Sequence, residues 1–154
     1  MARARALATA ALASAVLGIA LGPGGARADS DLYERRAPRD PAYEASCGTC
    51  HLAFAPAFLP QSSWSALLAG RGAHFGLPLS LSPEVLAELE SYLATHGNAP
   101  GEQGAPLKVT EQPWFLDEHP ARLRDGALAD PTIGRMSNCA ACHAGAAQGE
   151  FDDD

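Results

Sequence analysis

The sequence predicts an all-α fold of short helices joined by long loops, and three observations lead to this expectation. No run of alternating β-branched residues is long enough to indicate a sheet. Proline and glycine are frequent, 12 and 15 among 154 residues, and they divide the apolar segments into short stretches. Within those stretches apolar residues recur with helical spacing, most clearly between residues 83 and 96.

The clearest predicted helix covers about residues 83–96. Ser82 and Pro83 form a favourable N-cap and first helical position, and Gly97 ends the helix. One stripe of this helix is apolar and should face a core; it comprises Val85, Leu86, Leu89, Tyr92 and Leu93.

Three shorter helices are expected elsewhere. One, near residues 61–70, follows Pro60, ends at Gly70 and turns Trp64, Leu67 and Leu68 inward. Another runs from about Pro113 to Glu118, and a third starts at Asp130-Pro131 and runs towards Cys142. Residues 107–110 are a candidate short strand, and residues 97–109 form the expected linker between two halves.

Residues 1–28 have the features of a secretory signal peptide. Arg3 and Arg5 give a positive start, residues 6–21 are apolar, and Ala26-Arg27-Ala28 matches the small-x-small cleavage pattern. The alternative is a membrane anchor, but the apolar run is rich in alanine and short for a bilayer. We therefore expect cleavage after Ala28, a mature chain of residues 29–154 in the periplasm, and no membrane insertion after cleavage.

The mature chain is strongly acidic. Removing three arginines with the signal lowers the basic count from 11 to 8 against 18 acids, a net charge of −10. This charge argues against binding to nucleic acid or to anionic lipid surfaces. It favours a partner protein with a basic face, to which electrostatic attraction would steer the chain.

All four cysteines belong to two copies of the motif C-x-x-C-H, at residues 47–51 and 139–143. This motif is the attachment site of c-type haem. Cys47, Cys50, Cys139 and Cys142 would form thioethers to two haems, and His51 and His143 would each supply the proximal iron ligand. The expected architecture is thus two halves, about residues 29–97 and 98–154, each packed around one covalently bound haem.

Other uses of these cysteines are less consistent with the sequence. A disulfide between cysteines three positions apart closes too small a loop to stabilise the chain much. A zinc site with four thiolates does not require a histidine after each pair, and an oxidising compartment disfavours free thiolates. A thioredoxin-like site belongs to a βαβ pattern, which the sequence lacks.

The sixth iron ligand separates electron transfer from catalysis, and three histidines are available for it. His74 lies between glycines in an irregular stretch and precedes Phe75, and His119 precedes Pro120 at the end of a predicted helix. His96, beside the helix-ending Gly97, is the fallback ligand, because favourable interaction with the helix dipole is a sufficient explanation for a histidine at this position. Met136 is too close to Cys139 to reach the opposite haem face and is expected to pack in the core.

The sequence resembles the small periplasmic dihaem cytochromes c, the DHC family, over most of the mature chain. The stretches that carry the resemblance are Cys47-Gly48-Thr49-Cys50-His51, Pro56-Ala57-Phe58-Leu59-Pro60, Ser63-Trp64, His74-Phe75-Gly76, Pro113-Trp114-Phe115 before His119, Ser137-Asn138-Cys139-Ala140-Ala141-Cys142-His143, and Gly149-Glu150-Phe151-Asp152. The resemblance implies an electron carrier with two bis-histidine, low-spin haems, held by His51 with His74 and by His143 with His119. It also implies donation of electrons to a small oxygen-binding monohaem cytochrome c, and a membrane cytochrome b as a source of electrons.

Two other functions compete with electron transfer at this point. A haem enzyme, such as a dihaem peroxidase, needs one axial position that is open or can open. A haem-based gas sensor needs an exchangeable sixth ligand and an output domain, and the sequence indicates no second domain. We therefore expect a protein that transfers electrons and is not an enzyme.

Overall fold

The computed structural model describes residues 37–101 and 103–151, and these residues form helices, short 3₁₀ turns and loops without a strand. The all-α prediction is therefore confirmed, whereas the predicted signal peptide lies outside the described residues. The α-helices of the described part are α2 (Pro41–Cys47), α3 (Gln61–Ala69), α4 (Pro83–His96), α5 (Pro113–Glu118) and α6 (Ala121–Ala129). The 3₁₀ turns are η1 (Pro56–Phe58), η2 (Arg71–Ala73), η3 (Val109–Glu111), η4 (Cys139–Ala141) and η5 (Ala146–Gln148).

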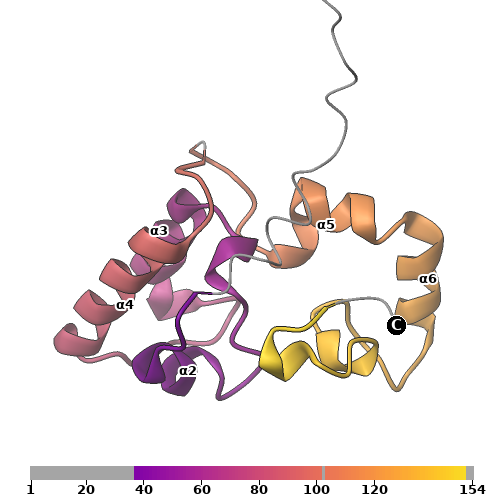
Figure 1. Cartoon of the computed structure of the whole chain (residues 1–154), viewed down its shortest axis with the longest axis horizontal. Helices are drawn as coiled ribbons and strands as arrows, with labels where there is room; N and C mark the ends of the chain where they lie inside the picture. Colours follow the sequence, from indigo (N-terminus) through magenta and orange to yellow (C-terminus); the bar gives the residue numbers. More distant parts are fainter. Residues whose placement is uncertain (1–36, 102, 152–154) are drawn as a thin grey trace, which may run out of the picture.

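The helices form two groups (Figure 1). α3 lies against α4, and α2 packs on α4 in the same half of the molecule. α5 and α6 follow one another in the other half, with the C-terminal segment below them in the view of Figure 1. Within the part of the chain that the structure covers, no helix has the length and apolar character needed to cross a bilayer.

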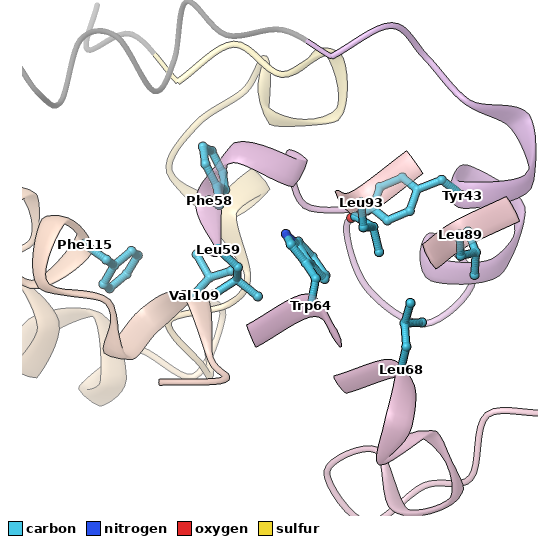
Figure 2. Packing of buried hydrophobic residues seen from close by; sticks show 9 residues of the cluster. All are labelled: Tyr43, Phe58, Leu59, Trp64, Leu68, Leu89, Leu93, Val109 and Phe115. Atoms are coloured by element: carbon cyan, nitrogen blue, oxygen red, sulfur yellow. The ribbon is translucent and has the colours of Figure 1, made fainter. Parts of the chain in front are cut away.

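One apolar core links the two groups (Figure 2). Leu68, Leu89, Leu93 and Tyr43 pack together at one end, and Phe58, Leu59, Val109 and Phe115 lie at the other, with Trp64 between them. The indole of Trp64 donates a hydrogen bond to the carbonyl of Pro56 at 2.7 Å, so its buried polar atom is satisfied. Each such buried side chain contributes about 1.5–3 kcal/mol, which makes this cluster the main protein contribution to stability.

The segment after α4 packs back onto the start of α3. Asn98 pairs with Pro60 in an isolated bridge, and the hydroxyl of Ser63 donates to the carbonyl of Pro106 at 2.9 Å. Gly101 has a φ of +69°, and an added Cβ would lie 2.4 Å from the Cβ of Pro60. Only glycine fits this close approach of two backbones.

Three predicted helices are confirmed. α4 begins at Pro83 with the hydroxyl of Ser82 accepting from the Val85 N–H at 3.3 Å, and it ends before Gly97. α3 and α5 begin directly after Pro60 and Gln112, within a residue of the predicted bounds. Trp64 and Leu68 of α3 and Phe115 of α5 are buried in the core, whereas Leu116 of α5 is exposed. Leu89 and Leu93 are the most deeply buried residues of α4.

The predicted strand at residues 107–110 is wrong, because this segment ends in the 3₁₀ turn η3. The side-chain amide of Gln112 donates to the carbonyls of Pro106 (2.6 Å) and Lys108 (3.4 Å). These carbonyls are therefore satisfied locally instead of by a partner strand.

The predicted helix from Asp130-Pro131 towards Cys142 is also wrong. The Asp130 carboxylate accepts from the N–H and hydroxyl of Thr132 at 2.8 and 2.7 Å, which makes a turn of the kind that competes with helix N-capping. Gly134, with a φ of +72°, then turns the chain away from helical geometry. A helix that we did not predict, α6, lies immediately before this turn, and the second motif forms only the short turn η4.

Candidate functional site

The C-terminal half contains a cavity of about 710 Å³ that brings one complete set of predicted site residues together. Cys139, Cys142, His143 and His119 all line it. Its volume lies within the range typical of cofactor pockets, about 300–1,000 Å³. The segment from α5 to the second cysteine motif, together with Phe58, Val109 and Phe151, thus surrounds one space large enough for a cofactor.

The second motif forms one tight turn. The N–H groups of Cys142 and His143 both donate to the carbonyl of Cys139, at 3.1 and 2.8 Å. This turn brings both thiols and the imidazole to the same cavity. The ring of His143 also contacts Phe151, with centroids 5.5 Å apart.

His119 is held in place by four interactions. Its N–H donates to the carbonyl of Phe115 at 2.9 Å, and Nδ1 donates to the same carbonyl at 3.1 Å. Its ring stacks on that of Phe115, with centroids 4.1 Å apart and planes inclined by 9°. The guanidinium of Arg124 donates to the carbonyl of His119. Since Nδ1 is engaged, Nε2 is the ring nitrogen left to bind a metal.

The α6 wall of this cavity has the character expected of a surface that contacts a flat apolar cofactor. Leu123, Gly126 and Ala127 line it from one face of the helix. Leu123 is 47% exposed although it is apolar, and a Cβ added at Gly126 would meet nothing within 4 Å. A large apolar group in the cavity would cover these residues.

In the N-terminal half, α2 leads directly into the first motif. The carboxylate of Asp40 accepts from the Tyr43 N–H at 2.7 Å and caps the helix, and Cys47 is its last residue. The first attachment motif therefore begins at the end of a helix. Nδ1 of His51 donates to the carbonyl of Leu52 at 2.6 Å, which again leaves Nε2 for a metal.

His74 lies opposite His51 on a tight turn after η2. The turn is closed by the Leu77 N–H donating to the carbonyl of His74 at 2.9 Å, and Phe75 adopts a φ of +47°, which is rare for an aromatic residue. Nδ1 of His74 is buried without a hydrogen-bond partner in the described part of the chain. Burial and the proximity of His51 lower the pKa of His74, so its ring is neutral at pH 7, as a metal ligand must be.

The two histidine pairs have almost the same separation. The ring centroids of His51 and His74 are 6.2 Å apart, and those of His119 and His143 are 6.1 Å apart. Two opposite imidazole–metal bonds of about 2 Å each, added to the ring dimensions, give a centroid separation of about 6 Å. Both pairs therefore fit one iron between two imidazoles. The ring planes differ, since they are inclined by 24° in the first pair and 75° in the second.

The two halves are not equally enclosed. The cavity of the N-terminal half, about 440 Å³, is lined by His51 but by neither His74 nor the cysteines of the first motif. Phe58 and Phe151 line both cavities, and their rings lie 5.1 Å apart. An aromatic wall thus separates the two cavities. The sequence did not reveal this role of Phe151, because its partners are far away in the chain.

The remaining candidate ligands lie elsewhere. The ring of His96 contacts Tyr92 on its own helix, at 4.9 Å, and lines neither cavity. Met136 packs against the hydrophobic core and also lines the C-terminal cavity.

The alternative uses of the cysteines find no support in the structure. All four are free, and no group of three or more potential ligands among the described residues could hold a metal ion directly. Burial raises the pKa of Cys47 to about 11 and also raises the pKa of Cys139. These thiols are therefore protonated at neutral pH and are not poised as thiolate ligands.

Comparisons with known proteins agree with this geometry. The family model for dihaem cytochrome c, DHC, matches residues 43–151. The chain is 39% identical to DHC from Rhodobacter sphaeroides, over 75% of this chain and 99% of that chain, with a TM-score of 0.60. It is 37% identical to the diheme cytochrome type c from Shewanella baltica OS155, over 75% and 89% of the two chains, with a TM-score of 0.65. No curated protein matches the chain. The chain thus belongs to the dihaem cytochrome c (DHC) family, which implies two c-type haems per chain and a function in electron transfer.

Proposed function

We propose that this chain is a periplasmic electron carrier, not an enzyme, with two haems that are each bound by two histidines. Cys47 and Cys50 hold one haem through thioethers, and Cys139 and Cys142 hold the other. His51 and His74 are the axial ligands of the first iron, and His143 and His119 are those of the second. When bound, each haem supplies one-electron redox chemistry at its iron.

The observation that carries the proposal is the separation of about 6 Å in both histidine pairs. Two imidazoles at this separation fill both axial positions, which leaves no site for a substrate or gas. The hydrogen bonds from Nδ1 of His51 and His119 to backbone carbonyls fix these rings and favour binding through Nε2. A carrier with fixed ligands undergoes little rearrangement when its charge changes.

The aromatic wall supports rapid exchange between the two sites. The rings of Phe58 and Phe151 are in contact with each other and line both cavities, so the two cavities lie on opposite sides of these rings. One axial ligand of the first haem, His51, lines one of these cavities, and both ligands of the second haem line the other, so we expect a short path between the two haems. The chain would carry two electrons, accepted and delivered one at a time.

The partners are redox proteins, and the acidic charge indicates their surface. We propose a small oxygen-binding monohaem cytochrome c as the acceptor and a membrane cytochrome b as a source of electrons. A basic face on either protein would be attracted to a chain of net charge −7, or −10 after signal cleavage at Ala28.

Absorption and electron paramagnetic resonance spectra of protein matured in a periplasm test the proposal. A pyridine haemochrome assay should count two haems c per chain. The ferric absorption spectrum of the native protein should show both haems low spin, without the charge-transfer band of a methionine ligand. Ring planes at 24° let both imidazoles act on the same iron d orbital, whereas planes at 75° act on two orbitals almost equally. We therefore expect one ordinary rhombic signal and one strongly anisotropic signal. A high-spin signal would instead indicate an exchangeable axial site, as in an enzyme or a sensor.

Replacing the distal histidines one at a time assigns the ligands. His74→Ala should convert one haem to high spin and leave the other low spin, and His119→Ala should do the same to the other haem. Added imidazole should restore the low-spin spectrum in each variant. His96→Ala is the matched control, and a high-spin haem in this variant would mean that His96 is a ligand.

A further inference from the structure

Two arginines line the C-terminal cavity, and their side chains make no polar contact with any other described residue. Arg122 is on the first turn of α6, and Arg135 is in the loop that follows α6. Neither guanidinium has an ion-pair or hydrogen-bond partner among the described residues. The backbone of Arg135 is fixed by two hydrogen bonds, from its N–H to Ile133 (2.8 Å) and from Asn138 to its carbonyl (3.0 Å).

The acidic residues of the same cavity do not neutralise these arginines. The carboxylate of Asp130 is engaged by Thr132, at 2.7 and 2.8 Å. Glu118 lines the cavity too, but no ion pair joins it to either arginine in the described part of the chain. Arg124, on the same helix as Arg122, donates instead to the carbonyls of Leu116 and His119. Two positive charges thus remain available at the cavity.

The walls of this cavity are mostly apolar, with Phe115, Leu123 and Ala127 among them. A haem is apolar over its faces and carries two propionate carboxylates at one edge. Such carboxylates need compensation when they lie beside apolar walls. A guanidinium binds a carboxylate with two parallel hydrogen bonds, which makes arginine the most suitable residue for this task.

We infer that Arg122 and Arg135 bind the propionate carboxylates of the haem in the C-terminal cavity and raise its reduction potential. The inference rests on the proposed function, since it needs a haem between His119 and His143. Reduction removes one positive charge from the iron. A neighbouring carboxylate therefore disfavours reduction, and a guanidinium that compensates this carboxylate favours reduction.

The N-terminal cavity lacks the same arrangement. Arg39 is the cation that lines it, and its Nε donates to the Glu44 carboxylate at 2.5 Å. Arg122 and Arg135 line the C-terminal cavity and not the N-terminal one, so their effect should be larger on the haem of the C-terminal cavity than on the other haem.

Potentiometric titration of the holoprotein tests this inference. Arg122→Gln and Arg135→Gln should each shift one of the two one-electron waves to lower potential, and the double variant should shift it further. His119→Met identifies this wave, because a methionine ligand raises the potential of the haem that it binds. Lys108→Gln removes one positive charge from an exposed residue that lines neither cavity, so it is the charge-matched control.

The outcomes separate this inference from the proposed function. The inference would be overturned if the potentials of both waves were unchanged in the two glutamine variants, or if both waves shifted equally and by no more than in Lys108→Gln. Two low-spin haems in the same protein would still support the electron carrier. Arg122→Lys and Arg135→Lys keep the charge and should have a potential close to that of the wild type. They also provide the test where a glutamine variant loses haem. Failure of the wild-type protein to show two low-spin haems would overturn the proposed function itself.

Discussion

Replacing Tyr43 by phenylalanine should change the dependence of stability on pH. Tyr43 is buried on α2, and its hydroxyl donates to the carbonyl of Phe54 at 2.6 Å. The ring of Phe54 in turn contacts that of His51, with centroids 5.1 Å apart. The hydroxyl thus joins the helix that carries Cys47 to the loop that follows the first motif.

The expected magnitude follows from two effects. At pH 7, loss of one neutral hydrogen bond should destabilise Tyr43→Phe by about 1 kcal/mol. Burial raises the pKa of Tyr43 well above 10, so the folded chain keeps the proton that the unfolded chain releases. The contribution of Tyr43 is therefore fully present below about pH 10 and is lost at higher pH, by about 1.4 kcal/mol per pH unit. The wild type and Tyr43→Phe should be equally stable at about pH 11, and Tyr43→Phe should be the more stable of the two at higher pH.

Urea titrations of the oxidised holoproteins, followed by circular dichroism at pH values from 7 to about 11.5, measure this difference. Effects of alkali on the haems or on other residues are common to both proteins and cancel. Tyr92→Phe is a graded comparison: Tyr92 is half-buried, its hydroxyl donates to the carbonyl of Pro38 at 3.0 Å, and burial raises its pKa less than that of Tyr43, so this variant should show a smaller effect of the same sign. A stability difference between wild type and Tyr43→Phe that stays constant up to pH 11 would refute the reasoning.

Three further predictions concern the core, a loop and the charge. Leu89→Ala, at a side chain with 0% exposure, should lower the free energy of unfolding by about 2–5 kcal/mol, and a loss below 1 kcal/mol in urea titration would contradict the packing described. Gly101→Ala should cost more stability than Gly104→Ala, because both residues have positive φ but only at Gly101 does a Cβ meet Pro60; equal melting temperatures would exclude the close contact. Electron transfer to a basic redox partner should slow as salt increases in stopped-flow measurements, and a rate independent of salt would argue against steering by charge.

The elements that sequence analysis predicted correctly are those whose signals are local. Ser82 and Pro83 determine the start of α4 whatever surrounds it, and the apolar stripe with Leu89 and Leu93 faces the core. α6 escaped prediction because its apolar residues do not face the core: Leu128 is 55% exposed, and Leu123 lines the cavity. A helix that packs against a cofactor lacks the pattern of one that packs against protein.

The error at Asp130 has a different physical origin. Asp130 followed by proline suits both a helix N-cap and a side-chain turn, and the sequence does not distinguish them. The hydroxyl and N–H of Thr132 favour the turn, and Gly134 continues it. Similarly, spacing along the chain identified His74 and His119 as candidates, but their distances to His51 and His143 depend on the tertiary fold. Arg122 and Arg135 line the same cavity because of the tertiary fold, and no local sequence pattern reveals this.

The two motifs are alike, yet their surroundings make the two redox sites unequal. One cavity is lined by the two cysteines and two histidines of the C-terminal half and by two arginines that have no ion-pair partner among the described residues. The N-terminal cavity, in contrast, is lined by His51 but not by His74. Burial, charge and hydrogen bonding around a haem set its reduction potential. Two sites that differ in all three respects should therefore titrate as two separate one-electron waves. In the proposed carrier, this inequality favours one haem as the position of the first electron.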